Sequence, residues 1–138
     1  MSINKRKMMD NALKKILVPV LRKLEFKGSF PHFRRLNENN IDLITFQFNR
    51  WGGSFIVELA TCSTDGVTMY FGEQVPPNKV TAHCINKRFR LGAQSEEVDG
   101  IWFDFENAKT EEDFEKVAFR VLALLNVTDR LWISNLFS

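Results

Sequence analysis

Cysteine and histidine are scarce in this 138-residue sequence, which contains two of each. Two cysteines, Cys62 and Cys84, are too few for the disulfide framework of a small secreted domain. The sequence has no Cys-x-x-Cys motif, no His-Glu-x-x-His motif and no calcium-binding loop. His83 and Cys84 are adjacent, so on a strand their side chains would point to opposite faces. We therefore expect no metal site and no cofactor.

Glycine and proline are also few, with seven and four residues, which excludes collagen-like and disordered chains. No segment repeats at a fixed spacing, so a solenoid is not expected. Hydrophobic residues make up 44% of the chain, and the thirteen phenylalanines among them predict an aromatic core. The length fits one domain over residues 1–138.

Long apolar runs are absent, and none approaches the ~18 residues of a membrane span. The N-terminus is basic, but Lys14 and Lys15 interrupt the apolar stretch that a signal peptide would need. We therefore expect a cytoplasmic protein without a membrane partner, in which both cysteines are reduced thiols.

Charge is distributed unevenly along the chain although the formal net charge is only +2. Residues 1–35 hold ten Lys and Arg against two acidic residues, and residues 93–115 hold nine Asp and Glu against one lysine. The two segments either lie near each other, within the fold or across a homodimer, or they leave a basic face for nucleic acid or anionic lipid. We favour the first interpretation, because charge balance alone argues only weakly about partners.

A first helix is predicted from about Ile3 to Phe26, with a kink or a division into two short helices at Pro19. Gly28 is the expected stop. The helix carries one apolar stripe, formed by Met9, Leu13, Ile16, Leu17, Val20, Leu21 and Leu24.

A second helix is predicted after Thr110, which with Asp113 resembles a capping box. Thr128 is expected to cap a separate short helix at the end of the chain. The core stripe of the second helix consists of Phe114, Val117, Ala118, Val121, Leu122 and Leu125.

The segment between the helices predicts an antiparallel sheet. Alternating residues and turn signals indicate strands at 30–36, 41–48, 54–61 and 67–71, with a hairpin loop at 49–53. Residues 88–91 and 101–105 alternate in the same way and are expected to pair with each other. The predicted fold class is therefore α+β, an antiparallel sheet of four to six strands with the N-terminal and C-terminal helices packed on one face. The side chains expected to be buried together are Phe46, Phe55, Val57, Leu59, Phe103 and Phe114.

The pairing of the two late strands would place Arg88, Arg90, Trp102 and Asp104 on the sheet face opposite the helices. Arginine binds carboxylates and phosphates with a planar fork and stacks on tryptophan. One interpretation is thus an anion-binding concavity, and the candidate binding residues are Arg35, Arg50, Trp51, Arg88, Arg90 and Trp102. The other, which we favour, is a structural Arg90–Asp104 cross-strand pair with Trp102 packed over its stem.

Catalytic chemistry has weak support in the sequence. A thiol nucleophile would need Cys62 near His83, or Cys84 near His32, and a small buried cysteine is the commoner case. A solvated strand end explains the clustered carboxylates better than a glycosidase pair does; these are Asp99, Asp104 and Glu106. We therefore expect no catalytic residue.

The order of several short motifs resembles a known family. Leu17-Val18-Pro19 leads into residues 24–28, Phe33 and Arg35 follow, and residues 88–92 precede Ile101-Trp102-Phe103. This order resembles the bacterial domain-of-unknown-function family 4304 over about residues 8–125. Two departures are that Phe26 and Gly28 replace a usual Gly-Phe pair and that Phe103 replaces a frequent tryptophan. The resemblance implies a bacterial origin and an α+β fold, and it implies no activity.

The leading functional hypothesis is a non-enzymatic module that binds a protein partner through the open sheet face or its rim. A small neutralising partner of a bacterial toxin is one example. The alternative is a binder of nucleic acid or another anionic ligand through the arginine and tryptophan face, and an enzyme of unknown class is the third.

Overall fold

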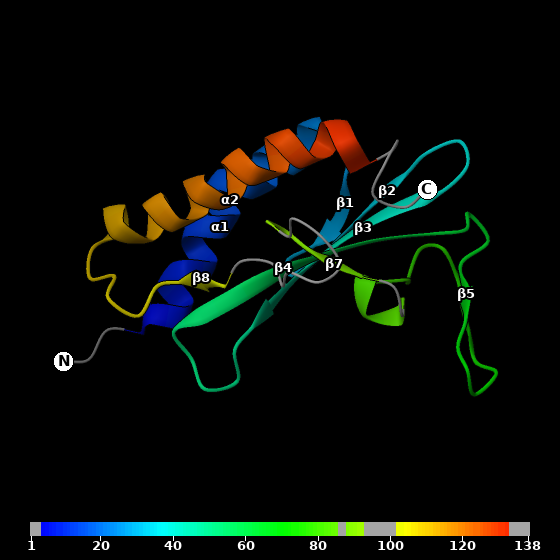
Figure 1. The fold of residues 1–138 in the computed structure, drawn as a ribbon, viewed down its shortest axis with the longest axis horizontal. Coiled ribbons are helices and arrows are strands. Elements are labelled where there is room, and N and C mark those ends of the chain that lie inside the picture. Colours follow the sequence, from blue (N-terminus) through cyan, green and yellow to red (C-terminus); the bar gives the residue numbers. More distant parts are fainter. Residues whose placement is uncertain (1–3, 86–87, 93–101, 133–138) are drawn as a thin grey trace.

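Two helices lie on one face of a six-stranded antiparallel sheet in the computed structural model, which describes residues 4–85, 88–92 and 102–132, with side chains up to residue 126 (Figure 1). The expected α+β architecture is therefore confirmed. The strands have the order β1-β2-β3-β4-β7, and β8 also pairs with β4. The helices are α1 (Lys5–Lys23) and α2 (Glu111–Trp132). The strands of the sheet are β1 (Lys27–Ser29), β2 (His32–Leu36), β3 (Ile41–Phe48), β4 (Ser54–Cys62), β7 (Phe89–Arg90) and β8 (Phe103–Asp104).

The helix α1 buries the predicted apolar stripe against the sheet. It begins after Asn4, whose side chain accepts a hydrogen bond from the Lys7 amide. It then continues through the exposed Pro19 as one helix, so the division into two short helices is wrong. Four residues of the predicted stripe are buried, Met9, Leu13, Leu17 and Leu21, together with Ala12, which was not predicted. The other three, Ile16, Val20 and Leu24, are only partly buried.

The C-terminal end of α1 differs from the expectation that Gly28 stops it. The amide of Phe26 donates to the carbonyl of Leu21 and the amide of Glu25 donates to Arg22, which is the double hydrogen bond of a Schellman motif. Glu25 takes the left-handed conformation at φ 72°, where glycine is usual. Gly28 lies in β1 instead, at φ 107°, where an added Cβ would lie 2.6 Å from the backbone oxygen of His32. Gly28 is therefore required by the β1–β2 hairpin and not by the helix.

The long hairpin of β3 and β4 supplies the centre of the core. Phe46 pairs with Val57 and Phe48 with Phe55 across the two strands. Phe55 stacks on Phe103 with ring centroids 5.3 Å apart, which joins β8 to the same cluster. The six predicted core residues are all buried together, so this prediction is confirmed.

The late strands pair differently from the prediction. β7 pairs with Glu58 and Leu59 of β4, whereas β8 pairs with Ser54 and Phe55 of the same strand. They therefore lie one after the other along β4 and do not pair with each other. Each is only two residues long, which gives the sequence pattern too little length to specify a partner.

The segment after β4 folds back toward the face of the sheet opposite the helices. The expected strand at 67–71 is shorter, since β5 (Val67–Thr68) pairs with β6 (Gln74–Val75) in a separate two-stranded sheet. A 3-10 helix, η1 (Ala82–Cys84), follows. This segment covers part of the face that the sequence suggested was open, through a second cluster of Ile41, Leu43, Ala60, Val80 and Ala82.

The helix α2 begins with the predicted capping box. The Asp113 carboxylate accepts hydrogen bonds from the amides of Lys109 and Thr110, and the Thr110 hydroxyl accepts one from the Asp113 amide. The helix runs through Thr128 without a break, so the separate short helix expected there is wrong, and residues 133–138 lie outside the described part. Neither this helix nor any other described one has the length and apolar character to cross a membrane.

Candidate functional site

A row of polar side chains crosses the sheet on the face opposite the helices. The strand register places His32 of β2 opposite Thr45 of β3, Thr45 opposite Glu58 of β4, and Glu58 opposite Arg90 of β7. Directly opposite residues of antiparallel strands share a face, so the four side chains form one line, which we call the polar row. Thr45 and Glu58 are buried within it.

Glu58 is the charged centre of the polar row. The residue is 5% exposed, and its Oε2 lies 3.1 Å from Nε of Arg88. Its Oε1 has no hydrogen-bond partner among the described residues and lies 3.7 Å from Nε2 of His83, which η1 holds beside the row. A buried carboxylate requires compensation by charge or hydrogen bonds, and here Arg88 supplies most of it.

His32 completes the row at β2. Its Nδ1 lies 3.0 Å from the Thr45 hydroxyl, and its ring meets that of His83 edge to face at 5.5 Å. Burial, followed by the charges of His83 and Arg34, lowers the pKa of His32 from its usual value. The neutral imidazole is therefore the favoured form of His32 in the fold.

The thiols lie near this face but form neither of the cysteine–histidine pairs considered above. Burial, with Cys84 nearby, raises the pKa of Cys62 to about 11, so its thiolate is scarce at neutral pH. The Sγ of Cys84 lies 3.7 Å from the Thr81 hydroxyl. Within the described ranges, no group of three or more His, Cys, Asp and Glu side chains is arranged to hold a metal ion.

Three of the predicted binding residues lie at the β7 end of the polar row. The guanidinium of Arg90 lies 5.6 Å from the Trp102 ring centroid, so these two side chains are neighbours. The expected Arg90–Asp104 ion pair is absent among the described contacts, and Asp104 instead accepts a hydrogen bond from the Glu106 amide. The arginine–carboxylate pair that does form joins Arg88 to Glu58.

Arg35 lies elsewhere, among the buried residues at the helix-covered face. It forms an ion pair of 2.9 Å with Asp42, donates to the Leu24 carbonyl, and lies 4.5 Å from the centroid of the Phe26 ring. It is 7% exposed, so it holds the end of α1 against β2 and β3 and is not part of an anion-binding concavity with Arg88.

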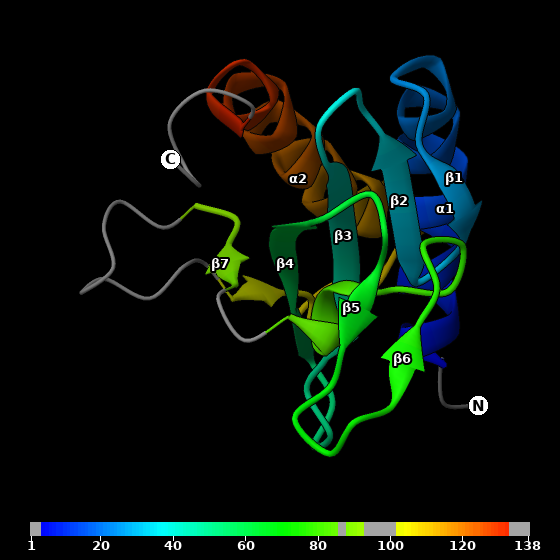
Figure 2. The ribbon, with the colours of Figure 1, turned by 90° about the vertical axis from the view of Figure 1, so that its right-hand side faces the viewer.

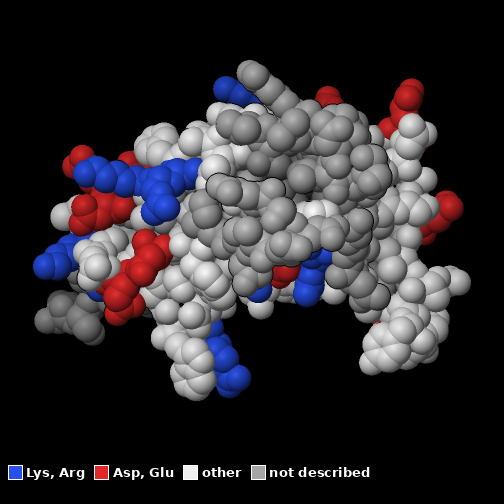
Figure 3. Space-filling view, in the orientation of Figure 1, with Lys and Arg blue, Asp and Glu red and all other residues white. Residues whose placement is uncertain are grey.

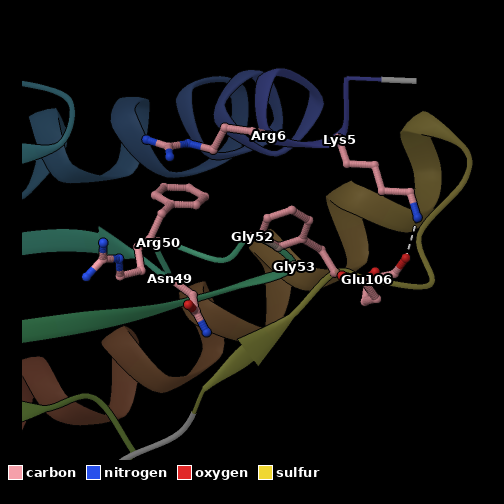
Figure 4. Close-up of a pocket in the computed structure, with 9 residues that line it drawn as sticks. Lys5, Arg6, Asn49, Arg50, Gly52, Gly53 and Glu106 are labelled. Atoms are coloured by element: carbon pink, nitrogen blue, oxygen red, sulfur yellow. Dashed lines mark hydrogen bonds between the residues drawn. The ribbon is translucent and has the colours of Figure 1, made fainter. Parts of the chain in front are cut away.

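Arg50 and Trp51 form the tip of the β3–β4 hairpin, beside a pocket of 260 Å³ (Figure 4). Lys5 donates to the backbone carbonyl of Glu106 on one side of this pocket, and Arg50 extends away from them on the other. The Arg50 guanidinium lies 5.0 Å from the centroid of the Trp51 ring, which is 84% exposed. The six predicted residues thus lie in three places and do not line one concavity.

Two hairpin tips carry exposed aromatic side chains on the side away from the helices. Trp51 belongs to the β3–β4 turn, and Tyr70 and Phe71, which are 96% and 59% exposed, belong to the β5–β6 turn. Both turns project below the sheet (Figures 1 and 2). In Figure 3 the underside of the molecule recedes between two projections at these positions. We call Trp51, Tyr70 and Phe71 the tip aromatics.

The basic and acidic segments of the chain meet in the fold, as the favoured interpretation of the charge pattern expects. Lys15 of α1 lies 2.9 Å from Glu115 and 3.5 Å from Glu111 of α2. In Figure 3, basic (blue) and acidic (red) side chains accordingly lie next to one another at the left-hand end of the molecule, where both helices begin. Part of the basic charge is therefore neutralised within the chain.

The amino-acid sequence matches the model of a known family. The match is to the domain of unknown function DUF4304 and extends over residues 17–125, which is most of the chain. The chain belongs to this family. The DUF4304 match spans α1 from Leu17, the whole sheet and α2 as far as Leu125, so the candidate site lies inside it. Comparison with curated proteins and with solved structures gives no significant match.

The residues of the polar row that sequence reasoning missed are Thr45 and Glu58, and His32 was considered only as a partner of Cys84. His32 and Glu58 stand 26 positions apart and meet only through the registers of three strands. An alternating pattern with a glutamate on the polar side was visible, but its burial depends on η1, which no periodicity indicates. His83 was considered only with a cysteine, although its neighbours are Glu58 and His32.

Proposed function

We propose that this domain is a non-enzymatic protein-binding module, and that its contact surface is the sheet face opposite the helices together with its rim. The observation that supports this most is the placement of the tip aromatics on two projections around a recessed face. Tyrosine, tryptophan and arginine are the residues that most often dominate binding energy in protein interfaces. Arg50, beside Trp51, adds one of these to the rim.

The polar row favours binding over catalysis. The hydroxyl of Thr45 lies beside the imidazole of His32, but Thr45 is fully buried, so a substrate cannot reach it. Glu58 is likewise buried, and it is held in an ion pair with Arg88. The buried Thr45 and Glu58 instead fix the structure of this face from within, and His83 beside them is exposed.

The alternative is an anionic ligand, for which the specific support is the contact between Arg90 and Trp102. Such a pair can bind a phosphate with the guanidinium and a base with the indole. This alternative is weaker because Arg88 is already paired with Glu58.

The proposal is tested by a partner screen with matched baits. The wild-type domain, the triple variant Trp51→Ala/Tyr70→Ala/Phe71→Ala, and Phe119→Ala are used in parallel. Phe119 is 54% exposed on α2, in the helix layer, and serves as the control. We expect a specific protein, such as a toxin whose activity the domain suppresses, to bind the wild type and Phe119→Ala and to be lost by the triple variant. A partner retained by the triple variant and lost by Phe119→Ala would place the interface on the helices and refute the proposed surface.

A further inference from the structure

A groove of about 750 Å³ lies at the edge of the sheet where α1 ends and β1 begins. Its volume falls in the usual range for ligand-binding clefts. The walls come from four parts of the chain: the end of α1, the β1–β2 hairpin, the start of β3 and the segment after β6. Figure 2 shows the side of the molecule on which β1, β2 and β6 lie.

The groove has an apolar wall next to solvent. Leu36 of β2 lines it and is 70% exposed. Pro77 lies along the same groove, and the buried Phe26 and Ile41 form its base. An exposed leucine alone needs no explanation, but one in a groove with a proline and an apolar base can hold an apolar side chain.

Three cations line the same groove. These are Arg22 from α1, Lys27 from β1 and Arg34 from β2, against one carboxylate, Glu25. Arg22 donates to the carbonyls of Phe26 and Gly28, so its position is fixed by backbone groups. Among the described residues, none of the three cations has a carboxylate within ion-pair distance.

Two of these cations oppose each other directly. The β1–β2 register pairs Lys27 with Arg34, which places two like charges on the same face of adjacent strands. Such a pair is destabilising in the free fold. An anionic group between them would relieve the repulsion, so the pair favours a negatively charged ligand.

We propose that this groove binds an extended acidic segment of a protein, in which Asp or Glu residues flank one leucine-sized apolar side chain. The apolar side chain would lie against Leu36 and Pro77, and the flanking carboxylates would pair with Lys27, Arg34 and Arg22. Arg34 and Leu36 follow His32 at every second position of β2, so the groove is continuous with the face of the polar row. The inference thus rests on the proposed function and names the chemistry of the partner.

The test measures fluorescence anisotropy with labelled peptides and the whole domain. The probe is acetyl-Asp-Glu-Leu-Asp-Glu-amide, and its two matched controls replace the leucine with serine or all acidic residues with lysine. Each lost charge-assisted contact is expected to weaken binding about tenfold. We therefore expect saturable binding of the probe, weaker binding of the serine peptide and no binding of the lysine peptide.

The protein variants separate a binding role from a structural one. Lys27→Gln/Arg34→Gln should lose at least tenfold in affinity for the probe while its melting temperature equals or exceeds that of the wild type, because the like-charge pair is removed. Lys116→Gln, an exposed lysine on α2, is the matched control and should bind as the wild type does. Absence of saturable binding, unchanged affinity of the double variant, or equal binding of a single-stranded oligonucleotide would overturn the inference.

The partner screen fails or succeeds independently of these peptides. A partner captured through the tip aromatics, with no peptide bound in the groove, would overturn this inference and leave the proposed function standing. The opposite result is also distinguishable. If the peptide binds through Lys27 and Arg34 but every captured partner is lost only by Phe119→Ala, the proposed surface is refuted and the groove inference stands.

Discussion

Single residues in this domain occupy conformations and surroundings that their type does not favour. Glu25 is the clearest case, because it is the one described residue other than glycine with a positive φ. His32 is another, since it is held in its neutral form beside a second imidazole. Each of these positions gives a measurable consequence.

Glu25→Gly is expected to stabilise the domain by about 0.5–1 kcal/mol. A side chain in the left-handed region costs roughly 1–2 kcal/mol, and glycine loses part of that gain through its more flexible unfolded state. The measurement is urea unfolding of the variant and the wild type. Lys23→Gly, at the last residue of α1, is the control and should destabilise, by at most about 1 kcal/mol. Two changes of the same sign would contradict the assigned helix end.

The free energy of unfolding should fall as the pH drops below the ordinary histidine pKa of 6.5. The pKa of His32 is lowered in the fold, so in this window the unfolded chain binds the proton more readily and protonation favours unfolding. The stability contributed by the neutral ring is present above pH 6.5 and is lost as the pH falls toward the folded-state pKa. Thr45, His83 and Arg34 face the ring and provide no carboxylate to offset this effect.

Urea unfolding at several pH values between about 5.5 and 8 measures this dependence. In His32→Asn the amide can keep the hydrogen bond to Thr45 without titrating, and the slope should be smaller than in the wild type. An equal slope in both proteins would show that His32 is not responsible.

The secondary-structure elements show which parts of the fold the sequence specifies. The spacing of Thr110 and Asp113 predicted the start of α2, and the alternation in 41–48 and 54–61 predicted the central hairpin almost to the residue. These signals are local, since a cap or a long alternating strand carries its own pattern. β7 and β8 lie within the predicted strands, but their partner was predicted wrongly, because strands of two residues carry too little pattern and the pairing is set by contacts between distant segments.

The same distinction applies to the candidate site. Arg90 and Trp102 are neighbours, as the sequence interpretation expects, but they are brought together by pairing of β7 and β8 with β4 and not by the predicted pairing of the two late strands. That Glu58 is the partner of Arg88 could not be inferred from alternation, because it depends on β7 pairing with β4. Arg35 has the same residue type but a different role, which only its neighbour Asp42 reveals.

The stacking of Phe55 in β4 on Phe103 in β8 is expected to make the core sensitive to truncation. Phe55→Ala and Phe103→Ala should each lower the free energy of unfolding by about 3–5 kcal/mol, because both rings are fully buried and in contact. Thermal and urea unfolding measure the loss. Phe119→Ala removes an exposed ring and should change stability by less than about 0.5 kcal/mol. Unchanged melting of both core variants would refute the assignment of this cluster.

At the scale of the whole molecule, several charged side chains are paired across elements, whereas the three cations of the groove have no carboxylate partner among the described residues. Lys15 and Glu115 join the two helices, Arg35 and Asp42 join β2 to β3, and Arg88, just before β7, pairs with Glu58 of β4. The surface in Figure 3 accordingly shows no continuous basic stripe on the side that it displays. The three cations of the groove form a short cluster and not the long path of cations that a phosphate backbone needs, so such a backbone is an unfavourable partner.

We therefore expect the domain to bind single- or double-stranded oligonucleotides no more tightly than the roughly 10⁻⁴–10⁻⁶ M of non-specific contacts. Titrations at two salt concentrations, with Arg88→Ala/Arg90→Ala beside the wild type, measure this. Submicromolar binding that weakens with salt and is lost in the double variant would favour the anionic-ligand alternative.

The shortness of the outer strands has a consequence for behaviour at high concentration. One edge of the sheet is the three-residue β1, where Arg22 already occupies the Gly28 carbonyl. The other edge, β4, is covered in part by β7 and in part by β8. Next to these pairings, the carbonyl of Val57 accepts a hydrogen bond from the Leu91 amide, and the carbonyl of Gly53 accepts one from the Phe105 amide. Neither edge offers the long row of free amides and carbonyls on which strands of another molecule add. Concentrated solutions should therefore resist amyloid-like growth, and any self-association should proceed through side chains.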